Sequence, residues 1–193
     1  MPIIGRTLGE AARMFADAMN RLLAKTLTET RLVVVGPQEG PRVAVAFRAE
    51  GGQPDWARLY TRVGPVRLFI GQNCEAIVVP RGRQLTTVKY KYTITLEESA
   101  DAPLIRWEYE RTPRKGGLYC RHHLQGPTAL DMGRGGPISL NDFHLPTGYV
   151  PIEEIIRFCI NDLQAAPRSD NWDELLRESY SRFRREYVGD VDM

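Results

Sequence analysis

The three histidines of the chain, His122, His123 and His144, lie close together in the sequence. Imidazole is well suited to proton transfer near neutral pH, because its unperturbed pKa is about 6.5. We take His123 and His144 as candidate proton-transfer groups, with His122 and Tyr119 in supporting roles. The alternative is structural: His122 is then a hydrogen-bonded core residue, His123 a solvated strand residue and His144 a cap of the following loop.

Basic side chains accompany His123 on one face of three predicted strands, over residues 87–96, 105–111 and 118–124. A histidine beside arginines and a carboxylate has the parts for metal-free phosphodiester cleavage: a base, an acid, and cations for the phosphorane charge. Tyr119 would share this face and could either stack on a nucleobase or donate a proton. The candidate phosphate-binding residues are Lys89, Lys91, Arg106 and Arg121, with Glu108 as the carboxylate. The alternative is a solvated face crossed by ion pairs worth about 0.2–1 kcal/mol each.

Other chemical motifs are sparse. Asp142 precedes His144 by two residues and could orient its imidazole. No phosphate-binding loop, dinucleotide fingerprint, HExxH or GxSxG motif is present. The three cysteines are widely spaced, with no CxxC pair, which favours a reducing compartment over a disulfide framework. The sequence therefore predicts neither a metal nor a cofactor.

Period-two alternation of apolar and polar residues marks the strands that would position these side chains. It is clearest over residues 87–96, where Val88, Tyr90 and Tyr92 alternate with lysines and threonines. The segments 105–111 and 118–124 repeat it, and short connections favour a meander. Further strands are predicted over residues 31–35, 42–47, 57–63, 66–70 and 75–79.

Helices are predicted at both ends of the chain. Residues 7–26 form an amphipathic pattern that starts with a Thr7 and Glu10 capping box. Two further helices are predicted, one over residues 152–163 and one that begins near Ser169 or Asp170. The sequence predicts an α+β fold, an antiparallel meander with an N-terminal helix and two C-terminal helices. We interpret residues 1–193 as one domain: an N-terminal helix in 1–30, a β-rich region over 31–124, a glycine- and proline-rich loop over 125–149 and a helical end over 150–188.

Composition limits the function classes. The chain has 193 residues, 42% of them hydrophobic, and a formal net charge of +2, as in ordinary globular proteins. This balance does not predict a dedicated nucleic-acid-binding surface, although a local basic face remains open. No apolar run approaches the roughly 20 residues that cross a bilayer. The first residues lack a secretory pattern, so we expect a cytoplasmic protein with no membrane partner.

The strand Arg106-Trp107-Glu108-Tyr109, the run Arg121-His122-His123 and the helix after them resemble small bacterial toxins of the TumE-like kind. The resemblance covers roughly residues 87–163. The family pattern has an Asn-Ala-Pro-His-like run after the arginine strand, where this chain has Glu110-Arg111-Thr112-Pro113, and the first 85 residues have no counterpart. The resemblance implies a toxin–antitoxin or phage-defence setting.

The first functional hypothesis is a toxin-like or phage-defence effector that cleaves RNA with His123 and His144. It requires both imidazoles and the two arginines to reach one solvent-facing pocket. The alternative is a non-enzymatic adaptor or subunit that binds another protein, such as an antitoxin, through an apolar stripe of helix 7–26 or of the last helix. Assembly of several copies of the chain into a homo-oligomer is compatible with either hypothesis.

Overall fold

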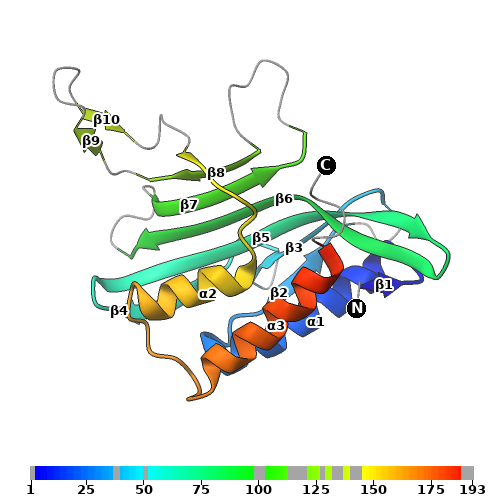
Figure 1. Ribbon diagram of the computed structural model, residues 1–193, viewed down its shortest axis with the longest axis horizontal. Coiled ribbons are helices and arrows are strands. Elements are labelled where there is room, and N and C mark those ends of the chain that lie inside the picture. The colour runs from blue at the N-terminus through cyan, green and yellow to red at the C-terminus, as the bar shows by residue number, and fades with distance from the viewer. Residues whose placement is uncertain are drawn as a thin grey trace.

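The computed structural model describes residues 3–36, 40–49, 52–97, 103–112, 121–126, 129–131, 137–139 and 145–187, with the backbone alone in 129–131, 137–139 and 183–187. It contains an N-terminal helix, a large antiparallel sheet and two C-terminal helices (Figure 1). The predicted α+β fold is therefore confirmed. No helix in these ranges is long and apolar enough to cross a membrane.

Nine strands of the described ranges form one antiparallel sheet, in the order β11-β8-β7-β6-β5-β3-β2, with β1 added to β6 and β4 added to β5. The pairing of β6 with β7 and of β7 with β8 confirms the predicted meander. The strands are β1 (Ile4–Gly5), β2 (Leu32–Val35), β3 (Val43–Phe47), β4 (Ala57–Thr61), β5 (Gly64–Val79), β6 (Gly82–Leu96), β7 (Pro103–Glu110), β8 (His122–Gln125) and β11 (Leu145–Pro146).

The structure corrects several strand boundaries. The segments 66–70 and 75–79 belong to one long strand, β5, which shifts its register on β6 between Asn73 and Cys74 instead of breaking. The predicted loop over residues 125–149 contains β9 (Ala129–Asp131) and β10 (Pro137–Ser139), which pair with each other, and also β11. Of the strand predicted over 118–124, residues 118–120 lie outside the described ranges.

The helices are α1 (Leu8–Thr26), α2 (Ile152–Asn161) and α3 (Trp172–Tyr187), and all three lie on one face of the curved sheet (Figure 1). Thr7 caps α1 as predicted, since its side-chain oxygen accepts a hydrogen bond from the Glu10 backbone N–H at 3.1 Å. The apolar stripe of α1 packs against the sheet. It therefore contributes to the core rather than to the free docking surface that the adaptor hypothesis needs.

Side chains that alternate along β5 and β6 build the core beneath the helices. Leu68 and Ile70 of β5 and Tyr90, Tyr92 and Ile94 of β6 are all fully buried. Each such residue contributes about 1.5–3 kcal/mol through removal of apolar surface from water. The residues between them, including Lys89 and Lys91, point to the opposite face. The sheet thus separates an apolar, helix-covered face from a charged outer face.

A glycine contact closes one end of the helix-covered face. The Leu85 N–H donates a hydrogen bond to the Ile3 carbonyl at 2.9 Å, which holds β1 against β6. Gly82 has φ of +136°, and a Cβ atom there would lie 2.5 Å from the Gly5 carbonyl oxygen. Glycine is therefore required for β1 to approach, and Ile3 then becomes part of a cavity wall.

Candidate functional site

Part of the predicted phosphate-binding cluster lies together on the outer face of the sheet. Lys91, Glu108 and His123 are direct neighbours across β6, β7 and β8. The Glu108 carboxylate lies 3.8 Å from Lys91 Nζ, 3.4 Å from Arg106 Nε and 3.4 Å from His123 Nε2. Lys89 forms a separate pair with Glu110 at 3.6 Å. A phosphate at this position would have to displace Glu108 from these groups.

His123 is buried, with 7% of its surface exposed, so the expectation that it faces solvent is wrong. The alternation along β8 correctly places it on the outer face. However, β11 pairs with β8 and puts Pro146 opposite His123, so β8 is not an open edge. Glu108 also contacts the imidazole from β7. A substrate would therefore reach this ring only after a local rearrangement.

His122 lies on the opposite face from His123, because consecutive strand residues point to opposite sides of a sheet. Its ring stacks on Tyr109, with a centroid distance of 4.4 Å and an interplanar angle of 15°. It also meets Tyr149 edge-on at 5.8 Å. The two neighbouring histidines therefore cannot serve one substrate on the same face of the sheet.

A chain of hydrogen-bond contacts connects the His122 ring to the backbone before α2. The Val150 N–H donates to the Tyr90 hydroxyl oxygen at 3.0 Å, and that oxygen lies 3.3 Å from His122 Nδ1. Either the Tyr90 hydroxyl or an Nδ1–H is the donor in this contact, according to which ring nitrogen carries the hydrogen. Burial, then the charges of Arg121 and His123, lower the pKa of His122. The geometry supports a neutral, packed imidazole, as in the structural alternative.

The remaining predicted site residues divide into two groups. Arg121 is exposed at the start of β8 and forms no ion pair with any described residue. His144, Tyr119 and Asp142 lie outside the described residues, so the distance between His123 and His144 stays untested. The structure therefore unites Lys91, Arg106 and His123 around Glu108 and sets His122 apart from them.

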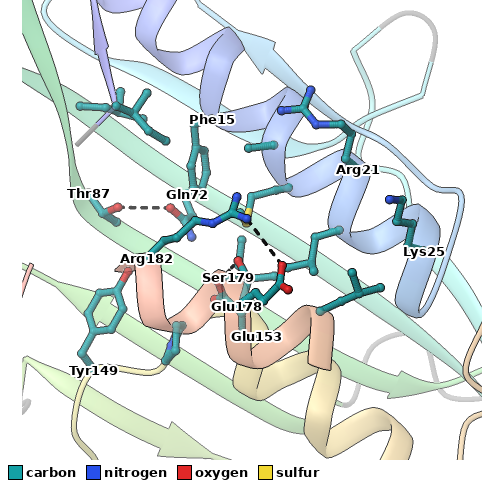
Figure 2. Close-up of a pocket in the computed structure, with 18 residues that line it drawn as sticks. Phe15, Arg21, Lys25, Gln72, Thr87, Tyr149, Glu153, Glu178, Ser179 and Arg182 are labelled. Atoms are coloured by element: carbon teal, nitrogen blue, oxygen red, sulfur yellow. Dashed lines mark hydrogen bonds and ion pairs between the residues drawn. The ribbon is translucent and has the colours of Figure 1, made fainter. Parts of the chain in front are cut away.

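A cavity of about 490 Å³ lies between the sheet and the helices (Figure 2). Its walls come from α1, β5, β6, α3 and the start of α2. The apolar part of its lining includes Phe15, Met19, Leu22, Leu85, Ile152 and Leu175. Most ligand pockets in proteins measure about 300–1,000 Å³ and combine apolar walls with a few placed polar groups. The cavity has this size and this composition.

Gln72 is the polar residue of the sheet wall and has 4% of its surface exposed. Its Nε2 donates to the Tyr92 hydroxyl at 2.6 Å, and its Oε1 accepts from the Thr87 hydroxyl at 3.2 Å. These two hydrogen bonds, the second of which is drawn in Figure 2, fix the amide plane at the cavity wall. An oriented amide of this kind can discriminate between ligand groups.

Glu153, at the start of α2, is the second buried polar group of the cavity, with 4% of its surface exposed. The Ser179 hydroxyl of α3 donates to its Oε1 at 2.5 Å. Burial raises the pKa of the Glu153 carboxyl, and the Ser179 hydrogen bond opposes that rise. The protonated carboxyl, a hydrogen-bond donor, is thereby favoured relative to an exposed glutamate.

Cations surround the opening of the cavity. Arg21 and Lys25 are spaced i, i+4 on α1, and both side chains are exposed. Neither forms an ion pair within the described ranges. Arg182 reaches from α3 toward α1 and pairs with Glu178, with 3.6 Å between Nη2 and Oε2 (Figure 2). The opening therefore carries two cations that lack an acidic partner among the described residues.

The sequence interpretation missed this cavity, although local signals pointed to its two buried polar residues. Leu68, Ile70, Gln72 and Cys74 alternate along β5, which places Gln72 on the apolar face. Glu153 precedes Ile156 and Ile160 by three and seven residues, which places it on the apolar face of α2. Both patterns therefore contain a polar residue at a position expected in the core, and this is the signal that could have indicated the cavity.

Metal and thiol chemistry find no support in the described residues. No group of three or more histidine, cysteine, aspartate or glutamate side chains is arranged there to hold a metal ion. Cys74 and Cys159 are free and buried, and desolvation raises the pKa of each thiol to about 12. Both are therefore poor nucleophiles at neutral pH. Cys120 lies outside the described ranges.

Comparisons with protein-family models, with curated proteins and with solved structures find no match to this chain.

Proposed function

We propose that the chain binds a small, partly apolar molecule in the cavity between the sheet and the helices. The observation that carries this proposal is the presence of Gln72 and Glu153, each 4% exposed, in the wall of a cavity that also has apolar walls from α1, α2 and α3. Both side chains already form hydrogen bonds within the chain, Gln72 with Tyr92 and Thr87 and Glu153 with Ser179, and each keeps further hydrogen-bonding capacity. A bound molecule that uses this remaining capacity gives the two residues a function.

The size of the cavity supports the same proposal. Protein interiors are close-packed, with few voids larger than a water molecule, whose share of liquid volume is about 30 Å³. The cavity opens to solvent, and its volume of about 490 Å³ lies within the range of about 300–1,000 Å³ that is typical of ligand pockets. Phe15 and Met19 of α1 remain half-buried along it, so part of their apolar surface is open to a ligand.

A fluorescence titration with 1-anilinonaphthalene-8-sulfonate, an apolar anion, tests this proposal. We expect saturable binding of one dye to the native, cooperatively unfolding chain. Ala18 lines the cavity, so Ala18→Trp should fill part of it and weaken dye binding by about tenfold or more. Ala24 is exposed on the same helix outside the cavity, and Ala24→Trp is the matched control. Equal binding by wild type and Ala18→Trp would contradict the proposal.

The second candidate function is the metal-independent cleavage of RNA on the outer face. The cluster of Lys91, Arg106 and His123 around Glu108 favours it, because it places cations and an imidazole together. The toxin–antitoxin or defence setting implied by the resemblance would add an antitoxin or complex subunit as partner. Burial of His123 and its contact with Glu108 make this function second to ligand binding.

Expression in bacteria tests the RNA function. If it is correct, the wild type degrades cellular RNA and slows growth, whereas His123→Ala loses both effects while its circular dichroism spectrum is unchanged. Ala18→Trp, which alters the cavity on the other face, should keep both effects. RNA that stays intact in cells expressing the soluble wild-type chain would exclude this second candidate.

A further inference from the structure

The unused hydrogen-bonding capacity of Gln72 indicates what the ligand presents to the sheet wall. A glutamine amide has two N–H donors and two acceptor lone pairs. One N–H donates to Tyr92, and one lone pair accepts from Thr87. One donor and one acceptor remain, with no further partner among the described residues. A neutral hydroxyl or amide, which both donates and accepts, fits this remaining pair.

Glu153 supplies a second buried polar group that could bind the ligand. Ser179 donates to its Oε1, and the backbone N–H of Glu153 itself also donates to the carboxyl, which forms no further hydrogen bond with the described residues. The titratable and charged residues around this carboxyl are Glu178 and Arg182 of α3, Glu154 of α2, Tyr92 of β6, and Tyr149 in the segment before α2. Arg182 is already paired with Glu178. A neutral ligand group is therefore preferred to an anion beside Glu153.

The opening has the opposite character. Arg21 and Lys25 are exposed, share one side of α1 and lack an acidic partner in the described ranges. Cations at the mouth of a low-dielectric cavity attract anions and raise their local concentration. Between the opening and the buried amide lie the apolar walls from α1, α2 and α3. The lining thus combines exposed cations on α1, apolar walls, the Arg182–Glu178 pair on α3 and the two buried polar residues Gln72 and Glu153.

We propose that the ligand is an amphipathic acid with polar groups at both ends: an anion held by Arg21 and Lys25, an apolar body, and a neutral hydroxyl or amide bound by Gln72 and Glu153. This inference rests on the proposed binding function. It deepens that function by naming the ligand class, and it gives separate roles to residues of α1, β5 and α2.

Isothermal titration calorimetry with three matched probes tests the ligand class. The probe 10-hydroxydecanoate carries both polar ends, decanoate lacks the hydroxyl, and 1,10-decanediol lacks the charge. We expect 10-hydroxydecanoate to bind about tenfold or more tightly than either of the others. Raising the salt concentration should weaken the binding of both anions, because salt screens the exposed charges of Arg21 and Lys25. The affinity for the uncharged diol should not change.

Variants of the chain test which residues bind the anionic end and the hydroxyl end of the probe. Replacing Arg21 and Lys25 together with glutamine should abolish the advantage of 10-hydroxydecanoate over the diol. Gln72→Met should abolish its advantage over decanoate. Arg13 is exposed on α1 away from the cavity, so Arg13→Gln is the control for the loss of a helix charge. Loss of an advantage in Arg13→Gln as well would overturn the assignment.

The outcomes separate this inference from the proposed function. Equal affinity for all three probes, or dye binding without binding of any probe, overturns the two-ended acid and leaves the binding cavity in place. Absence of binding for the dye and for every probe overturns both. Tighter binding of 10-hydroxydecanoate than of the other two probes, with each advantage abolished by the matching variant, supports both.

Discussion

Replacing Tyr92 with alanine is expected to lower the free energy of unfolding by about 3–5 kcal/mol, the range for large aromatic truncations in a packed core. Tyr92 is fully buried. Its ring stacks on Tyr90 with a centroid distance of 4.6 Å and an interplanar angle of 6°. Urea denaturation followed by circular dichroism measures the loss. Tyr60, which is 69% exposed, gives the control: Tyr60→Ala should change stability by about 0.5 kcal/mol or less.

Conservative variants separate the ring of Tyr92 from its hydroxyl. Tyr92→Phe keeps the ring and removes the acceptor of the Gln72 N–H, which should cost about 1–3 kcal/mol. In a double-mutant cycle with Gln72→Met, the two losses should not add, because both variants remove the same hydrogen bond. A Tyr92→Phe variant as stable as the wild type would contradict this account and would show that the amide finds another partner in the cavity.

The fold followed from the sequence where one pattern ran without interruption. The alternation from Val88 to Leu96 correctly placed Tyr90 and Tyr92 on the apolar face and Lys89 and Lys91 on the other. The α1 helix was predicted to within one residue, because its cap and its apolar stripe agree. Interrupted patterns failed: Gly71 suggested a turn, yet β5 continues through it to Val79.

The candidate site was harder to predict, since a strand pattern gives the face of a residue but not what covers that face. The pattern correctly put His123 with Lys91 and Arg106, but the pairing of β11 with β8, distant in sequence, buries the imidazole. The cavity combines Phe15, Gln72, Glu153 and Arg182 from four separate elements. No local spacing connects such residues, so their convergence becomes visible only in the folded chain.

Glu153 should make the stability of the chain fall as the pH rises, which is the reverse of the usual effect of a paired carboxylate. Burial raises the pKa of this carboxyl in the folded state above its unfolded value of 4.5. The unfolded chain therefore releases the proton first, and the folded state loses relative stability from about pH 4.5 up to the folded pKa. Above that pKa the loss is complete and stays constant.

Glu153→Gln removes the titrating proton and keeps an acceptor for the Ser179 hydroxyl. The Tm of this variant should exceed that of the wild type by a margin that grows from pH 4.5 upward, as followed by thermal denaturation between pH 4 and 9. Each 1 kcal/mol shifts the Tm by about 2–4 °C in a chain of this length. Glu174 is exposed on α3 and forms no ion pair with a described residue, so Glu174→Gln should keep the pH profile of the wild type. Parallel profiles for Glu153→Gln and the wild type would mean that the Glu153 carboxyl is hydrated, and the neutral hydrogen-bonding end of the ligand would then have to be assigned to Gln72 alone.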